Sequence, residues 1–163
     1  MKTNQLTKLA LLTTIALIIF VIELQLPLPI AIPGIKLGLA NIVTVYAMFH
    51  LGPKDTLFIL IGRVLLGGIF SGRITSLLYS FIGGLCCYVV MALTRKIFNK
   101  KQIWICSILG SISHVIGQMA VAIILTGTFE IIGYLPILIL GSIVTGSIIG
   151  TLAQLMLEKM PKK

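Results

Sequence analysis

The chain has 163 residues, of which 58% are hydrophobic and 10% are charged, and its mean hydropathy is +1.12. Soluble domains average roughly 45–50% apolar and about 25% charged residues, so this composition excludes an ordinary soluble globular protein. A helix that crosses a bilayer needs about 20 mostly apolar residues, so six such helices would leave only about 43 residues for turns and tails. That length leaves no room for a soluble catalytic domain.

Six apolar runs follow one another along the chain and predict an all-α, polytopic membrane protein with one integral membrane domain over residues 1–163. The expected spans are residues 6–26, 35–51, 56–70, 74–93, 103–126 and 134–157. The third run is interrupted by Arg63 and by the pair Gly67 and Gly68. The first run exceeds the usual 7–15 apolar residues of a secretory signal and lacks a small-residue cleavage site, so we expect it to remain as a membrane helix.

The 13 Lys and Arg residues outnumber the four acidic residues and give a net charge of +9. With the N-terminus inside, ten of these cations lie in cytoplasmic segments, Lys36 and Arg73 lie outside, and Arg63 lies within a span. This distribution follows the positive-inside rule. We therefore expect a multi-pass protein of the bacterial plasma membrane with both termini cytoplasmic, and no nucleic-acid partner. The basic segment 95–101 is expected to contact anionic membrane lipid.

The sequence contains no pattern typical of a catalytic or metal site. Cys86, Cys87 and Cys106 form no CxxC pair, and His50 and His114 lie in different spans, so no metal site is expected. Phosphate-binding loops, dinucleotide fingerprints and nucleophile elbows are absent. No two acidic residues are close in sequence, whereas enzymes acting on diphosphates usually hold Mg²⁺ through carboxylates. We expect no catalytic residues, no cofactor and no enzyme activity from the chain alone.

Ionisable and polar residues inside the spans are the strongest candidates for a binding site, because they are costly in a membrane. Arg63, midway along the third span, either anchors an anionic or carbonyl-bearing ligand or forms a structural bond, for example to Glu23. His114 and Gln118 are one turn apart and share a helix face, and Asn41 lies within the second span. Each could simply make hydrogen bonds between helices. Together, on the outward halves of the spans, they predict a polar pocket that opens to the outside.

Residues near the outer ends of the spans have two expected roles. Lys36 and Arg73 depart from the positive-inside pattern and could attract an anionic ligand. Tyr79 and Tyr134 are expected in the aromatic belt at the membrane interface.

The stretch that separates the first two spans is rich in helix breakers, which are Pro27, Pro29, Pro33 and Gly34. Irregular backbone at membrane depth is tolerated only where protein or a water-filled cavity covers it. We expect this loop to act as a gate over the pocket.

Small residues recur where helices are expected to touch. The cytoplasmic half of the first span contains Ala10, Thr13, Thr14 and Ala16, a face that would suit contact with a helix of a partner subunit. Four-residue spacings that permit close helix packing in lipid also recur. They join Gly34 to Gly38, Gly68 to Gly72, and Ser142 to Gly146 and Gly150.

The segment from residue 23 to residue 43 resembles the signature of the Gx transporter family, which is also labelled heptaprenyl diphosphate synthase component I. Residues 51–54, 63–68, 80–84 and 114–118 support this resemblance, which covers nearly the whole chain. The family is similar to the substrate-binding S components of energy-coupling factor transporters. Those are compact six-helix bundles that capture a vitamin or similar small molecule from outside and work with a coupling subunit and two ATPases.

The resemblance implies a transport protein that binds a vitamin-like or quinone-related ligand. From their polarity and position we expect the pocket to be lined by Glu23, Lys36, Asn41, Arg63, His114 and Gln118. The coupling contact, often Ala-x-x-x-Ala in S components, would fall on Ala10 and Thr14, where this chain departs from the pattern. The alternative is a non-catalytic scaffold in quinone or isoprenoid metabolism or extracellular electron transfer, because related genes neighbour such functions. A quinone site should open sideways to lipid, whereas a transporter pocket should open outward.

Overall fold

The computed structural model describes residues 3–25 and 38–159. Within these residues the chain is helical and contains no strand, which confirms the all-α prediction. The α-helices are α1 (Thr3–Gln25), α2 (Asn41–His50), α3 (Pro53–Ser71), α4 (Ile74–Thr94), α5 (Ile103–Thr126) and α6 (Leu135–Lys159). Two short 3-10 helices, η1 (Lys100–Gln102) and η2 (Phe129–Tyr134), precede α5 and α6. The expected gate residues and Lys36 lie outside the described residues.

Four helical segments of the described chain are long and apolar enough to cross a membrane, namely α1, α4, α5 and the continuous stretch of η2 with α6. The six expected spans are therefore not all confirmed. The helix α3 has 19 residues, but Lys54, Asp55 and Arg63 lower its hydropathy. It is nevertheless unbroken through Gly67 and Gly68.

The helix α2 is much shorter than the expected span over residues 35–51. It has 10 residues, so it is about 15 Å long, roughly half of a bilayer's hydrocarbon thickness. It starts only at Asn41 because Gly38 has a positive φ of 79°, which no α-helix permits. A tight turn separates α2 from α3, and in it Gly52 precedes Pro53, which occupies the first helical position of α3.

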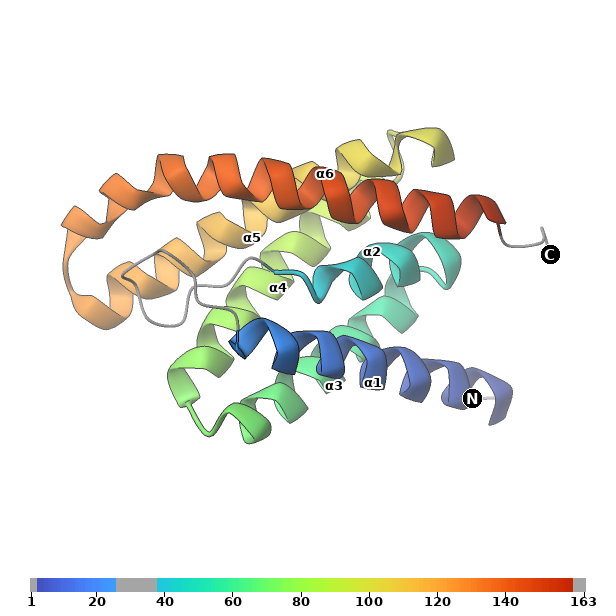
Figure 1. Cartoon of the computed structure of the whole chain (residues 1–163), viewed down its shortest axis with the longest axis horizontal. Helices are drawn as coiled ribbons and strands as arrows, with labels where there is room; N and C mark the ends of the chain where they lie inside the picture. Colours follow the sequence, from blue (N-terminus) through green and yellow to red (C-terminus); the bar gives the residue numbers. More distant parts are fainter. Residues whose placement is uncertain (1–2, 26–37, 160–163) are drawn as a thin grey trace.

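The helices run back and forth along the bundle, so α1 begins and α6 ends at the same end (Figure 1). The helix α5 packs between α4 and α6, while α1 packs mainly on α3. The short α2 is the central element and packs against α1, α3, α4 and α6. In the same view α5 and α6 extend well beyond the end of α1 (Figure 1). The end of α1 and the start of α2 therefore lie within the length of the bundle.

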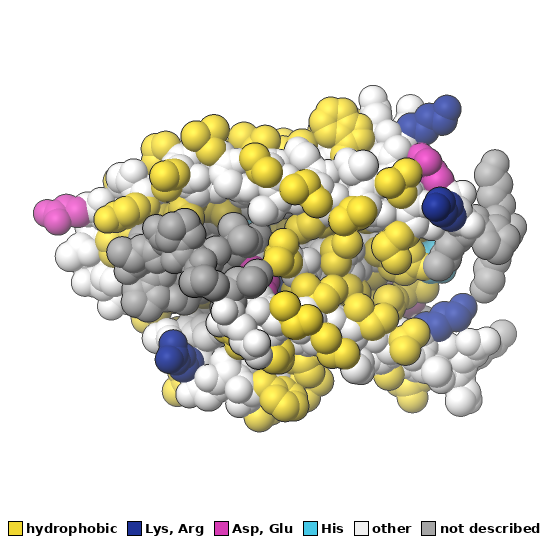
Figure 2. All heavy atoms as spheres, viewed as in Figure 1, with side chains coloured by type: hydrophobic (Ala, Val, Ile, Leu, Met, Phe, Trp, Pro, Cys, Tyr) yellow, Lys and Arg dark blue, Asp and Glu magenta, His cyan; other side chains and the backbone are white. Residues whose placement is uncertain are grey.

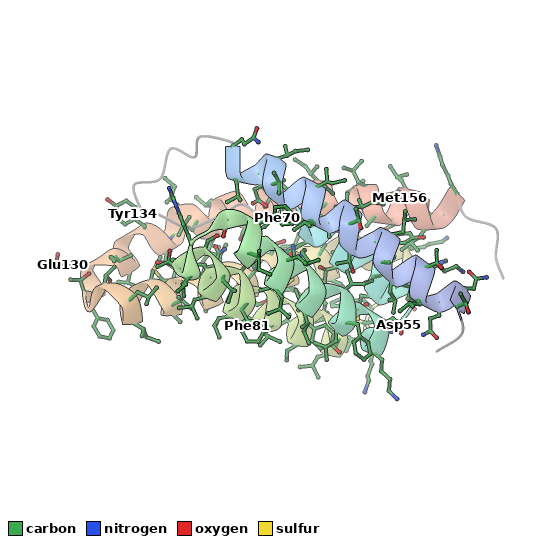
Figure 3. All side chains as sticks on the ribbon, turned by 90° about the horizontal axis from the view of Figure 1, so that it is seen from below. Asp55, Phe70, Phe81, Glu130, Tyr134 and Met156 are labelled. Atoms are coloured by element: carbon green, nitrogen blue, oxygen red, sulfur yellow. The ribbon has the colours of Figure 1, made fainter. Side chains whose placement is uncertain are left out.

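The outer surface is largely apolar. Hydrophobic side chains cover the middle of the visible face, and charged side chains gather toward its two ends (Figure 2). Asp55 and Glu130 lie at opposite ends of the bundle (Figure 3). Large exposed side chains such as Ile69, Ile74 and Ile124 would be a liability in water. This distribution is that of a membrane protein, in which lipid covers the apolar belt.

The small-residue stripe of α6 packs directly against α5, as its spacing predicts. A methyl group added at Gly150 would lie 2.5 Å from the Cα atom of Trp104, and one at Gly146 would lie 2.9 Å from the Cα atom of Ile108. The prediction is wrong for Gly72, which ends α3 in the left-handed conformation and has no neighbour within 4 Å of an added methyl. Close backbone approach therefore holds α5 and α6 together.

The first helix presents its small residues to two different surroundings. Ala16 is fully buried in a core cluster with Ala47 and Ile59, and Thr13 faces α3 at Gly62. Ala10 and Thr14 are exposed on the outer side of α1, where the Thr14 hydroxyl donates to the Ala10 carbonyl. Only these last two residues remain open to a partner helix.

Tyr79 corrects one interfacial prediction. Its side chain is 3% exposed and packs in a core cluster with Val115, Met119 and Leu138, because it faces α5 and α6. Tyr134 is half exposed at one end of the bundle, as Figure 3 shows. Its position is compatible with the expected aromatic belt.

Candidate functional site

Five polar side chains from four helices converge inside the bundle, and we call them the polar cluster. They are Glu23 near the end of α1, Asn41 at the start of α2, Arg63 midway along α3, and His114 and Gln118 on α5. None is more than 5% exposed. The sequence singles out the same residues, although it gives no distance between them.

Glu23 and Gly38 join the end of α1 to the start of α2. The Gly38 N–H donates a hydrogen bond to the Glu23 carboxylate, and the Gly38 carbonyl accepts one from the Asn41 N–H. Glycine suits this position because φ is positive and because an added methyl would lie 2.8 Å from the Asn41 amide nitrogen. The same methyl would lie 3.6 Å from His114 Nε2, so Gly38 lies between α2 and α5.

Arg63 is bound from two sides. Its Nη2 donates to Asn41 Oδ1 at 3.2 Å, and the negative charge of Glu23 attracts the guanidinium. A buried ion requires such compensation, because removing it from water is costly. These two interactions are compatible with the structural alternative for Arg63, and its structural and ligand-binding roles both stay predictions.

Two consecutive glycines bring the α4 backbone against the polar cluster. A methyl added at Gly83 would lie 3.0 Å from Gln118 Cγ and from His114 Cε1. One added at Gly84 would lie 3.8 Å from Arg63 Nη2. Sequence reasoning used this glycine pair only as part of a family motif and missed its position at the site. The available signal was the cost of glycine inside a helix, which calls for a packing reason.

Several buried polar atoms of the site have no hydrogen-bond partner among the described residues. Both Gln118 amide atoms, Nε2 and Oε1, are in this state, as are Arg63 Nε and Thr44 Oγ1, one turn beyond Asn41 on α2. Gln118 is 1% exposed. Buried polar groups in proteins are nearly always paired. The site therefore has hydrogen-bonding capacity that its own residues do not use.

A family model described as heptaprenyl diphosphate synthase component I matches residues 12–156. The chain belongs to this family. No curated protein and no solved structure matches it significantly. Every residue of the polar cluster falls within the matched region, so the cluster belongs to the part of the chain that the component I family shares.

The acidic residues of this component I chain are dispersed. Glu23 is in α1, Asp55 in α3 accepts hydrogen bonds from the Gln5 amide, Glu130 is in η2, and Glu158 in α6 accepts one from Gln154. Among the described residues no three His, Cys, Asp or Glu side chains group closely enough to hold a metal ion. A single carboxylate, that of Glu23, joins the polar cluster. Such a donor set does not fit the carboxylate-held Mg²⁺ that diphosphate chemistry usually needs.

Arg73 and His50 are not part of the polar cluster, whereas the Cys87 thiol is near enough to the Arg63 guanidinium to interact with it electrostatically. Lys36 and the expected gate residues lie outside the described residues. Arg73 is exposed at the start of α4. His50 ends α2 and stacks on Tyr46 with ring centres 5.2 Å apart. Cys87 and Cys106 are buried and Cys86 is half-buried, and all three are free thiols.

Proposed function

We propose that this component I protein is a non-catalytic membrane subunit that binds a small molecule in the polar cluster and acts with protein partners in its transport. One observation carries the proposal: five buried polar side chains meet inside an apolar bundle, and Gln118 and Arg63 retain unused hydrogen-bonding atoms. Polar groups at membrane depth typically mark substrate pathways. A purely structural network would be expected to pair its members, because an unpaired buried group destabilises the fold.

Transport in this proposal depends on partners, since the sequence contains no phosphate-binding loop with which to use ATP. The exposed Ala10 and Thr14 face of α1 is the proposed contact with a coupling subunit, in the manner of an S component of an energy-coupling factor transporter. The family description, a component of a synthase, supports the existence of a protein partner. With the basic end of the bundle in the cytoplasm, the captured ligand would enter from the outer face of a bacterial plasma membrane.

The family description favours a second candidate function. The protein would then be an accessory membrane scaffold in quinone or isoprenoid metabolism, holding a prenylated quinone or its precursor for a separate catalytic subunit. The dispersed carboxylates argue against synthesis by this chain itself. The chemical nature of the bound molecule separates the two candidates.

The test is to purify the full chain in a mild detergent and to identify bound small molecules by mass spectrometry after extraction. We expect a polar solute in the wild-type protein and in the control variant Lys159→Ala, whose lysine is exposed at the last residue of α6, away from the polar cluster. Arg63→Ala should lose the solute, and Arg63→Lys should retain it weakly, because lysine keeps the charge but not the planar fork of donors. Helix content measured by circular dichroism shows whether each variant is folded.

Unchanged retention by folded Arg63→Ala would contradict a ligand role for the polar cluster. A quinone or polyprenyl compound in the extract would support the scaffold instead. Folded wild-type protein that contains no bound compound after this purification would count against both candidates.

A further inference from the structure

The unpaired hydrogen-bonding atoms of the polar cluster indicate which donors and acceptors a bound ligand would need. The Gln118 amide offers a donor atom, Nε2 with two N–H groups, and an acceptor atom, Oε1, and neither atom has a partner among the described residues. A side-chain amide pairs best with a planar group that places its own acceptor and donor side by side, as glutamine does with the edge of adenine. Arg63 Nε adds a donor that requires a further acceptor.

The carboxylate and the guanidinium of the polar cluster carry opposite charges. Arg63 carries one positive charge, and the Glu23 carboxylate that attracts it carries one negative charge. The backbone N–H groups at the start of α2 are also engaged, since those of Asn41 and Ile42 bond to the carbonyls of Gly38 and Leu39. An anionic ligand would leave a buried net charge without compensation, which is strongly unfavourable. A neutral ligand adds no such cost.

We infer that the ligand of the polar cluster is an uncharged, planar heterocycle with adjacent hydrogen-bond donor and acceptor on one edge, such as a cyclic imide or an aminated ring. Its edge pairs with both atoms of the Gln118 amide, and a second acceptor receives the Arg63 Nε–H. This inference rests on the proposed function and specifies its substrate class.

The same argument ranks the other ligand classes. A quinone presents only acceptors, so it satisfies Gln118 Nε2 and Arg63 Nε but leaves Gln118 Oε1 buried and unpaired. A diphosphate brings negative charge that Arg63 cannot balance alone, because the positive charge of Arg63 is already offset by the carboxylate of Glu23. Both therefore fit the site less well than a neutral edge with mixed donors and acceptors.

Ligand-observed saturation-transfer NMR on the full chain in detergent micelles tests the inference with four small probes at millimolar concentration. Thymine carries the neutral imide edge, and 1,3-dimethylthymine has the same ring without its N–H donors. Duroquinone is the acceptor-only probe, and orotate is the anionic probe. We expect thymine to bind about tenfold more tightly than each of the others, because 1,3-dimethylthymine and duroquinone leave Gln118 Oε1 unpaired and orotate brings a negative charge into the site.

Variants at two glutamines provide the matched comparison. Gln118→Met keeps the length of the side chain and removes both amide atoms, so it should weaken thymine binding about tenfold and weaken 1,3-dimethylthymine binding less, because that probe never bonded to Oε1. Gln154→Met makes the same chemical change on α6, where the Gln154 amide bonds to Glu158 outside the polar cluster. It should leave all four probes unaffected.

Tightest binding of duroquinone or orotate, or equal thymine binding by Gln118→Met, would overturn the inference. The proposed function would survive that result if Arg63→Ala still lost its co-purified solute. Failure of every probe to bind would also overturn the inference. If Arg63→Ala also kept its solute, the proposed binding function of the polar cluster would be contradicted together with the inference.

Discussion

Removing the charge of Glu23 tests whether the polar cluster is a coupled electrostatic unit. Glu23→Gln keeps an amide oxygen that can accept the Gly38 N–H bond, so its effect reports mainly the loss of the negative charge. Arg63, 5% exposed, would then be a buried cation without a counter-charge. Breaking a buried pair on one side costs about 3–5 kcal/mol. The free energy of unfolding should fall by that amount.

The double variant Glu23→Gln/Arg63→Met should be more stable than Glu23→Gln alone. It contains no buried charge and loses mainly the hydrogen bond from Arg63 to Asn41, worth about 1 kcal/mol. The coupling energy between the two positions should therefore be about 2–4 kcal/mol.

Unfolding in mixed micelles by added sodium dodecyl sulfate measures these differences. The single tryptophan, Trp104, reports the transition by fluorescence, and circular dichroism reports helix content. Glu158→Gln is the control, because Glu158 is exposed on α6, and it should change stability by less than about 0.5 kcal/mol. Additive effects at positions 23 and 63 would refute the view that the two charges stabilise one another.

Two further predictions concern packing and topology. Gly150→Ala should destabilise the bundle by about 1–3 kcal/mol, because the new methyl would lie 2.5 Å from Trp104 Cα. Gly141→Ala is the control and should be tolerated, because its methyl would meet nothing within 4 Å. Thermal unfolding of the two variants measures the difference in stability. In intact cells an impermeant maleimide should label Glu130→Cys, while Lys159→Cys should react only after permeabilisation, because we expect the basic end of the bundle to face the cytoplasm. Equal melting temperatures, or the reverse labelling pattern, would contradict the respective prediction.

The sequence predicts the last three helices closely and the second one poorly. Long apolar runs bounded by charged residues or glycine mark α4, α5 and α6, so their expected limits differ from the observed ones by at most two residues. The limits of α2 depend on the backbone conformation at Gly38, which hydropathy does not encode. The position of Tyr79 was misjudged for a related reason: chain order gives depth in the membrane, but it does not say which way a helix face points.

The polar cluster was predictable in its residues and not in its geometry. Glu23, Arg63 and Gln118 stand out because they are polar or charged within apolar runs. Gly83 has no polar side chain that would mark it in the sequence, and its role depends on the close packing of α4 against α5. The link between Glu23 and the backbone of Gly38 likewise depends on a turn that the sequence alone does not specify.

The pairing of Glu23 with Arg63 also has a consequence for how the protein is made. Glu23 lies in α1, which leaves the ribosome before α3, and its counter-charge, Arg63, follows 40 positions later in the chain. At synthesis rates of 5–20 residues per second, Glu23 would wait about 2–8 s for Arg63 to be made. During that interval α1 holds a carboxylate that lipid would disfavour. Stable release of α1 into the bilayer is therefore coupled to the arrival of α3, and the two helices are expected to leave the insertion machinery as a pair.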